Sequence, residues 1–401
     1  MQHNMKLLAQ HTLNGHGGMG EGMSMQLARG GRRVLWLAHE SAPKNFTAVD
    51  VTDPRSPRVI VQTDLPHRAM RSNSLEVCGD ITAVAYQVAV PGAKPAGFEL
   101  FDIAEPERPR SIALFDASGP HSRGCHVLWF VDGKTVHMAC ADPELKPRDP
   151  KDDQIYRIVD VSNPAKPVAL GRWHLPGTME DDDAAPPTRL PAKFDAGFRA
   201  HNTNVYPERP DRCYLGYLDG GMMVLDISNP REPTLVSRWS NSPPYNGFTH
   251  TVLPLFERGL LVVTDESIQN DGADWPKLVW LLDARDEKNL VSIGTLPVSG
   301  VTPLLQHGGR CGAHNVHENR PGEGTWRSDD IVLGTFFNAG VRAYDVRDPF
   351  APREIAYYVP PTPEGSPVPT AQVNDVFVDD RGIVFAVDRH AGGLYCLEMN
   401  V

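Results

Sequence analysis

A short pattern of alternating apolar residues, an aspartate and a proline-containing turn recurs along the chain. It is clearest as AVDVTDPRSPRVI around Asp50, IVDVSNPAKPVAL around Asp160 and VLDISNPREPTLV around Asp226. Alternating apolar residues are typical of a half-buried strand. The Asn/Asp-Pro pair favours a turn, because proline fixes φ and the preceding side chain can bond its own backbone. Each copy therefore predicts two antiparallel strands joined by a short turn.

Six copies of this pattern are present, and a truncated seventh copy, GLYCLEMNV, ends the printed sequence. Their aspartates are Asp50, Asp102, Asp160, Asp226, Asp283 and Asp345. Upstream of the copies lie further strand pairs with glycine-containing turns, such as HVLWFVDGKTVHMAC and VNDVFVDDRGIVFAV. Seven repeats of four antiparallel strands predict an all-β fold, a seven-bladed β-propeller. An open array of repeats and a pair of β-sandwiches are the alternatives.

The seventh repeat contains only three predicted strands, so we expect the N-terminal segment 5–13 to complete it and close the ring. KLLAQHTLNG in this segment resembles VALGRWHLPG at 168–177, which ends its own blade. The whole chain, 1–401, is then one propeller. Its predicted blades are 19–66, 70–117, 122–177, 196–241, 246–299, 309–361, and 370–399 with 5–13.

The repeated hairpin resembles the LVIVD-repeat family, most clearly in DVTDPRSP, DVSNPAKP and DISNPREP. The resemblance extends over nearly the whole chain and implies a β-propeller. It implies little about activity, because the family is functionally mixed and a fold does not determine a function. The copy at Asp283, DARDEKNL, lacks both prolines, so we expect a longer or irregular outer hairpin there.

Composition narrows the class of protein further. The 35 glycines and 36 prolines argue against a helical bundle. A net charge of −11 without a long basic run disfavours binding to nucleic acid or to a membrane surface. The N-terminal residues lack the apolar core of a signal peptide, and the six cysteines form no CxxC pair. These features predict a cytoplasmic protein with reduced thiols, and they make no prediction of its oligomeric state.

Four histidines occupy one equivalent position, at the start of the innermost predicted strand of four consecutive blades. They are His126 in GCHVLWF, His201 in AHNTNVY, His250 in THTVLPL and His314 in AHNVHEN. Ring symmetry brings the four imidazoles together on the axis, and imidazole binds transition metals well. We therefore predict a site for Fe, Cu, Zn or Mn. The alternative is four channel histidines bonded to water or backbone.

Two further histidine assignments stay open. A shift of one residue would exchange His126 with Cys125 in the predicted register. His317 has the opposite strand parity to His314, so it is expected to point into a blade rather than at the metal. The equivalent positions of the other blades hold Asn73, Asn374 or Asp375, and Met23 or Met25.

Other polar residues at strand ends near the same mouth are candidate catalytic acids, bases or partners of the imidazoles. They are Glu40, Asp265, Glu266, Asp388, Arg389 and His390. Ordinary solvated loop charges are the alternative for each of them. The acidic, proline-rich insertion at 178–195 is either a lid over the mouth or a plain loop.

These features together predict a metal-dependent enzyme that acts on a small organic molecule. Redox or oxygen-dependent chemistry is the first choice, and metal-assisted hydrolysis or a lyase reaction is the alternative. The histidine ring is similar in kind to those of carotenoid-cleaving oxygenases and selenium-binding-type thiol oxidases, which are also seven-bladed propellers. A non-catalytic scaffold for protein binding is the alternative from another class.

Overall fold

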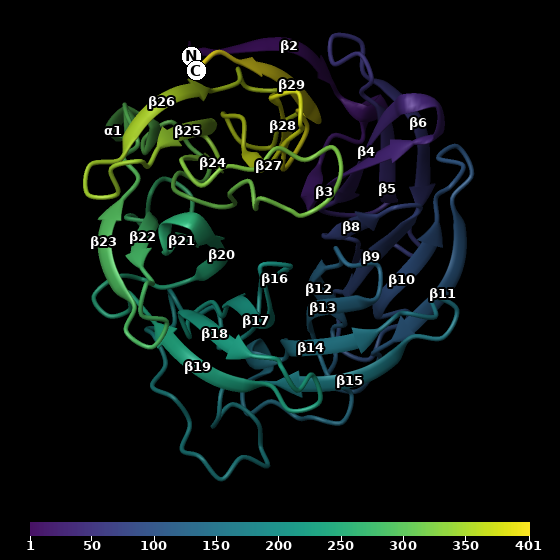
Figure 1. The fold of residues 1–401 in the computed structure, drawn as a ribbon, viewed down its shortest axis with the longest axis vertical. Coiled ribbons are helices and arrows are strands. Elements are labelled where there is room, and N and C mark those ends of the chain that lie inside the picture. Colours follow the sequence, from purple (N-terminus) through teal and green to yellow (C-terminus); the bar gives the residue numbers. More distant parts are fainter.

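The computed structural model describes residues 1–401 and arranges seven antiparallel sheets around a central axis (Figure 1). Within each sheet, the strands follow one another from the axis to the rim in chain order, except where the N-terminus adds an outer strand. The predicted all-β, seven-bladed propeller is therefore confirmed.

The strands of blades 1 to 3 are β3 (Met19–Ala28), β4 (Arg32–His39), β5 (Lys44–Asp50), β6 (Arg58–Asp64), β7 (Met70–Arg71), β8 (Leu75–Cys78), β9 (Ile81–Val88), β10 (Gly97–Asp102), β11 (Arg110–Asp116), β12 (Cys125–Trp129), β13 (Thr135–Cys140), β14 (Ile155–Asp160) and β15 (Val168–Trp173). Those of blades 4 to 7 are β16 (Thr203–Tyr206), β17 (Arg209–Gly216), β18 (Met222–Asp226), β19 (Thr234–Trp239), β20 (Thr249–Leu255), β21 (Leu260–Asp265), β22 (Val279–Asp283), β23 (Val291–Thr295), β24 (Ile331–Thr335), β25 (Val341–Asp345), β26 (Arg353–Tyr358), β27 (Val373–Val378), β28 (Ile383–Asp388) and β29 (Leu394–Met399).

The N-terminal segment lies on the outside of the last two blades. Strand β2 (Met5–His11) pairs antiparallel with β29, from Met5 opposite Met399 to His11 opposite Leu394. Strand β1 (Gln2–His3) pairs with β26 of blade 6. The two chain ends consequently lie next to each other at the rim (Figure 1).

Helical structure is limited to single turns. They are α1 (Val301–Leu304) and the 3-10 turns Leu13–Gly15, Arg29–Gly31, Pro150–Asp152 and Phe256–Arg258. None of these helices has the length and apolar character needed to cross a bilayer.

The aspartate of the repeat has one structural role in all six copies. Its carboxylate accepts a hydrogen bond from the backbone N–H two residues later, as from Ser162 to Asp160 at 2.8 Å. The proline-free copy does the same, because Arg285 N–H donates to Asp283 at 3.1 Å and Lys288 N–H donates to Asp286 at 3.0 Å. The expected longer or irregular hairpin at this copy is therefore wrong: the aspartates hold the turn without proline.

Candidate metal centre on the propeller axis

The four histidines at equivalent positions lie together on the axis, and each is at most 5% exposed. Their ring centroids are 4.7 Å apart for His126 and His201, 3.8 Å for His201 and His250, and 4.5 Å for His250 and His314. Blades 3 to 6 therefore place four imidazoles in one continuous row.

Irregular backbone turns these side chains towards the axis. His126 and His250 lie where β12 and β20 shift register against their neighbours, between Cys125 and Val127 and between Thr249 and Val252. Such bulges re-aim a side chain at the end of a strand. His201 precedes β16. The segment around His314 is joined to β24 by an isolated bridge between Val316 and Gly334 and by backbone hydrogen bonds, without forming a strand, so the expected regular innermost strand of blade 6 is wrong.

Glu21 is the member of this cluster that the sequence did not predict. It lies within the register shift of β3 between Met19 and Met23 and is 7% exposed. A Cβ on Gly20 would lie 2.4 Å from the Asn73 carbonyl oxygen, and one on Gly22 would lie 2.2 Å from the Leu75 nitrogen. Glycine on both sides is thus required for the close approach that brings Glu21 to the axis.

Hydrogen bonds fix the ring orientation of three of the histidines. His314 Nδ1 lies 2.5 Å from the backbone oxygen of Asn374, which can only accept, so Nδ1 carries the proton. His201 Nδ1 lies 2.8 Å from Asn202 Oδ1, and Asn202 is oriented because its Nδ2 donates to Glu318 at 2.6 Å. In both rings the Nε2 atom is left with a lone pair.

His250 follows the same rule through a short chain of bonds. Thr251 Oγ1 donates to Asn315 Oδ1 at 2.9 Å, so it can accept from His250 Nδ1 at 2.8 Å. Three Nε2 lone pairs therefore face the same region. A metal-binding imidazole usually has its other ring N–H held in this way by a carbonyl or another acceptor.

The lone pairs converge on the Glu21 carboxylate. The Nε2 atoms of His201, His250 and His314 lie 3.6, 3.4 and 3.6 Å from a Glu21 oxygen. Glu21 Oε2, His250 Nε2 and His314 Nε2 are buried and have no hydrogen-bond partner. A charge-assisted N–H···O bond would be about 2.7–2.9 Å long. Two donor atoms that are each about 2.1 Å from one metal ion lie about 3.0–3.4 Å apart. The observed distances between Nε2 and the Glu21 oxygens are closer to this ligand–ligand distance than to the length of a direct hydrogen bond.

Glu266 extends the donor set on one side. Its oxygens lie 3.8 Å from His250 Nε2 and 3.7 Å from His314 Nε2, and Arg310 donates to it at 2.6 Å. Burial would raise the pKa of Glu266, but His314, Arg310 and His250 together lower it to about 2. Such a carboxylate is a weak base at neutral pH, so it suits a metal ligand better than the general acid or base role expected from the sequence.

The protonation of the cluster also favours a cation. Burial, and then the charge of His250, lowers the pKa of His201 to about 3, so this ring is neutral at neutral pH. Burial would raise the pKa of Glu21, but His250, His314 and His201 in their protonated forms would keep it well below its usual range, and a cation bound to their Nε2 atoms would supply the same positive charge. A neutral imidazole and an ionised carboxylate are the forms that bind metal.

His126 occupies the edge of the cluster. Its Nε2 lies 3.0 Å from His201 Nε2, and its Nδ1 lies 3.1 Å from Gln87 Oε1 and 3.3 Å from an Arg71 nitrogen. Groups of donor atoms within 4.8 Å of one another include Glu21 with His126 and His201, Glu21 with His250 and His314, and His201 with His250 and Glu266.

The remaining predicted candidates fall into two sets. Arg389 and Glu40 lie at the mouth, where Glu40 accepts hydrogen bonds from Arg389 at 2.8 Å and Arg71 at 2.5 Å. Asp265 instead accepts from Trp280 and Asn241, at 2.7 and 2.5 Å.

The carboxylate of Asp388 accepts bonds only from backbone N–H groups, including those of Gln372 and His390, so it holds a loop. The half-buried ring of His390 makes no hydrogen bond. The structure therefore brings Glu40, Glu266 and Arg389 to the histidines or their mouth, and not Asp265 or Asp388.

Two other predicted positions have structural partners. His317 accepts a bond from the Val378 N–H at 3.2 Å and faces the Trp326 oxygen at 2.7 Å, so it belongs to the blade wall, as its parity predicted. Asn374 donates to the backbone oxygens of Met19 and Gly20, which links blade 7 to the bulge that carries Glu21. The insertion at 178–195 is tied to blade 3 by Arg189, which forms ion pairs with Asp152.

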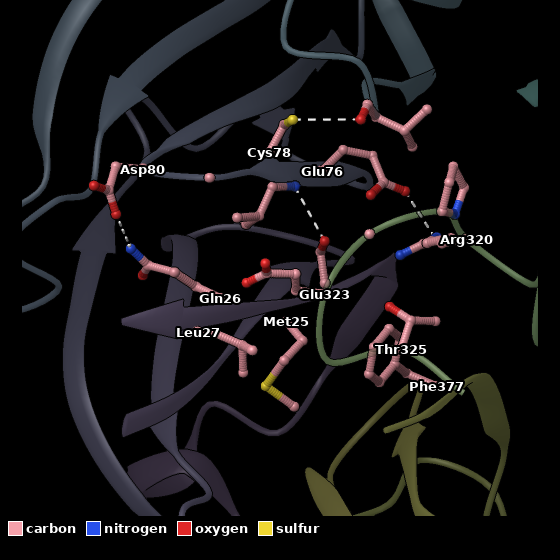
Figure 2. A pocket seen from close by; sticks show the side chains of 16 residues that line it. Met25, Gln26, Leu27, Glu76, Cys78, Asp80, Arg320, Glu323, Thr325 and Phe377 are labelled. Atoms are coloured by element: carbon pink, nitrogen blue, oxygen red, sulfur yellow. Dashed lines mark hydrogen bonds and ion pairs between the residues drawn. The ribbon is translucent and has the colours of Figure 1, made fainter. Parts of the chain in front are cut away.

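A second polar cluster lies towards the other ends of the inner strands, beside a cavity of about 380 Å³ (Figure 2). Arg320 pairs there with Glu76 at 2.9 Å and with Glu318 at 3.0 Å. Asp375 is 4% exposed, and burial raises its pKa well above the usual range. Burial raises the pKa of Glu76 to about 8 against the opposing charge of Arg320, and the charges of Glu318 and Asp375 add to the increase.

This shift predicts a pH-dependent stability. A carboxyl group with a pKa of about 8 in the fold and 4.5 ordinarily binds more protons in the folded state between these values, so stability falls as pH rises through that window. Glu76→Gln should unfold like the wild type near pH 5 and be more stable near pH 9. Thermal unfolding across this range checks the sign, and a pH-independent difference would contradict it.

Comparison with known proteins supports the repeat and the fold. Residues 153–174 and 213–240 match the LVIVD repeat. The chain is similar to the solved β-propeller domain of Cps50 (Swd1) from Myceliophteria thermophila, with 13% identity, a TM-score of 0.57 and 99% of both chains covered. This likeness shows the fold alone. No curated protein sequence matches the chain.

Proposed function

We propose that this LVIVD-repeat propeller is a metal-dependent enzyme that acts on a small organic molecule at the histidine–Glu21 cluster. The main observation behind this proposal is that the Nε2 lone pairs of His201, His250 and His314 converge on the buried carboxylate of Glu21. Without a cation, Glu21 Oε2, His250 Nε2 and His314 Nε2 are buried without a hydrogen-bond partner, and the hydrogen-bond partner of His201 Nε2 is His126 Nε2 at 3.0 Å. A buried arrangement of this kind is costly unless it is compensated.

The number of donors favours redox chemistry over the hydrolytic alternative. Four imidazoles and two carboxylates surround the site, namely His126, His201, His250, His314, Glu21 and Glu266. Zinc sites usually take four ligands in total, and a catalytic zinc takes three from the protein. A larger mixed nitrogen and oxygen shell suits Fe or Mn, which change oxidation state.

The residues of the chain have separate tasks in this proposal. His201, His250, His314, Glu21 and Glu266 would hold the metal, with His126 at the edge of the shell, and the metal would supply the redox chemistry when it is bound. Arg310 keeps Glu266 ionised beside them. Glu40 separates the guanidinium groups of Arg71 and Arg389 at the mouth, where substrate enters.

Metal analysis of the purified protein tests the proposal. After expression with Fe, Mn, Zn and Cu available, we expect about one equivalent of Fe or Mn per chain. About one equivalent of zinc alone would favour the hydrolase or lyase alternative. Less than about a tenth of an equivalent of any of these metals, also after reconstitution, would reject the metal site and favour a scaffold.

A further inference from the structure

Five arginines gather at the mouth above the histidines. They are Arg71, Arg123, Arg199, Arg310 and Arg389. Four of these have carboxylate partners within 3 Å, and the fifth, Arg199, has neither an ion pair nor a hydrogen bond. The paired arginines contact Glu40 (Arg71 and Arg389), Glu266 (Arg310) and Asp153 (Arg123).

Arg199 is placed for contact with a ligand of the histidine site. It precedes His201 by two residues on the irregular segment that enters blade 4. Its Nε atom is buried without a partner. Burial, and then the charges of Arg123 and Arg71, lower the pKa of Arg199, while Asp153 and Glu266 oppose this.

The local charge is opposite to that of the whole protein. The chain carries a net charge of −11, but the five guanidinium groups have only four carboxylates near them: Glu40, Glu266 and Asp153 pair with them, and Glu21 lies deeper, where its charge acts on Arg389. The mouth therefore has a surplus of one positive charge before any metal binds. A positive concave surface concentrates anions and directs them inward.

A cavity of about 320 Å³ between blades 1 and 2 is lined by two of these arginines and by the exposed Arg68. Arg71 and Arg123 line it together with Met70 and Val88. Gln87 also lines it and lies 3.1 Å from His126 Nδ1. The cavity thus offers an apolar wall for an organic body, with Arg71 and Arg123 in its lining and His126 next to it through Gln87. Arg199 lies outside this lining, near Arg71 and Arg123.

We propose that this mouth binds the carboxylate of a small organic anion and that Arg199 is its anchoring guanidinium. The inference rests on the proposed function, because it names the substrate class of that site. Arginine binds carboxylates through two parallel hydrogen bonds, and the unpaired guanidinium of Arg199 has its donors free for this. The apolar wall then selects a carboxylate attached to a hydrocarbon body.

Calorimetric titration with benzoate and the neutral isostere benzamide tests the proposal on metal-loaded protein. Benzoate should bind at least about 10-fold more tightly than benzamide, and Arg199→Met should weaken benzoate binding by about 10-fold or more. Arg199→Lys keeps the positive charge but loses the paired N–H donors of the guanidinium group, so it should weaken benzoate binding less than Arg199→Met does. Arg231→Met is the matched control, because this exposed arginine lies in a rim turn and its side chain makes no hydrogen bond.

Two further measurements separate this proposal from the metal proposal. The metal content of Arg199→Met should equal that of the wild type, since Arg199 is not a donor to the cluster. Benzoate should also bind metal-stripped wild type, because the arginines remain. Benzoate binding therefore tests the anion site even if the metal site is rejected. Equal affinity for benzoate and benzamide, or equal weakening by Arg199→Met and Arg231→Met, would overturn the anion site.

Discussion

The variant His250→Ala is expected to lose its metal. His250 lies in the middle of the row, 3.8 Å from His201 and 4.5 Å from His314 between ring centroids, and its Nε2 lies 3.4 Å from Glu21. Substitutions of residues that merely orient a metal ligand cost about 10–100-fold in affinity, so removal of a ligand should cost at least that much. Metal content after dialysis and competition with a chelator measure the loss.

His137→Gln is the matched control for this variant. His137 is also buried, at 7% exposed, but its Nδ1 bonds the Tyr156 hydroxyl inside blade 3, at 2.7 Å. Any loss of metal through general damage to the blades should appear in both variants, whereas loss of a ligand should appear only in His250→Ala. Full metal occupancy in His250→Ala would remove this histidine from the site.

The propeller could be predicted from the sequence because its signal is local and repeated. Each of the six full copies carries the aspartate that bonds the backbone two residues later, as Asp160 does with Ser162. The apolar alternation before Asp160 marks the strand that this turn ends. Seven imperfect copies support one another, so the loss of both prolines after Asp283 did not hide its turn.

The histidine cluster could be predicted from the sequence for a different reason. Rotational symmetry turns an equivalent position in sequence into proximity on the axis, although His126 and His314 are far apart along the chain. The backbone at these positions is irregular in different ways, as a bulge in blades 3 and 5 and as bridges in blade 6. The side chains still converge because each position lies at the axial start of its blade.

Glu21 was missed because the same reasoning depends on a regular strand. Alternation through GEGMSMQL predicted Met23 or Met25 for blade 1, yet the register shift between Met19 and Met23 turns Glu21 to the axis instead. An acidic residue between two glycines at the level of the histidines was the available signal. The orientation of Asp265 towards Trp280 depended on tertiary contacts that no local pattern records.

Substitution of Glu21 by glutamine should change stability and metal binding in opposite directions. In metal-free protein, Glu21 is a buried carboxylate with an unpartnered oxygen, and burial of a charge without compensation is unfavourable. Glutamine has nearly the same shape without the charge, so metal-free Glu21→Gln should unfold at the same temperature as the wild type or higher. Its metal affinity should fall by about 10-fold or more, because the anionic donor is lost.

The two measurements together discriminate between a metal ligand and a structural residue. A structural Glu21 that pairs with protonated histidines would make metal-free Glu21→Gln less stable, since imidazolium groups would lose their counter-charge. Glu99→Gln is the comparison, because Glu99 is a carboxylate that accepts a bond from Tyr86 at 2.6 Å within blade 2 and is remote from the histidines. Thermal unfolding of chelator-treated protein, followed by metal titration, gives both quantities. A lower melting temperature with unchanged metal affinity would assign Glu21 to the fold, whereas the opposite pair of results assigns it to the metal.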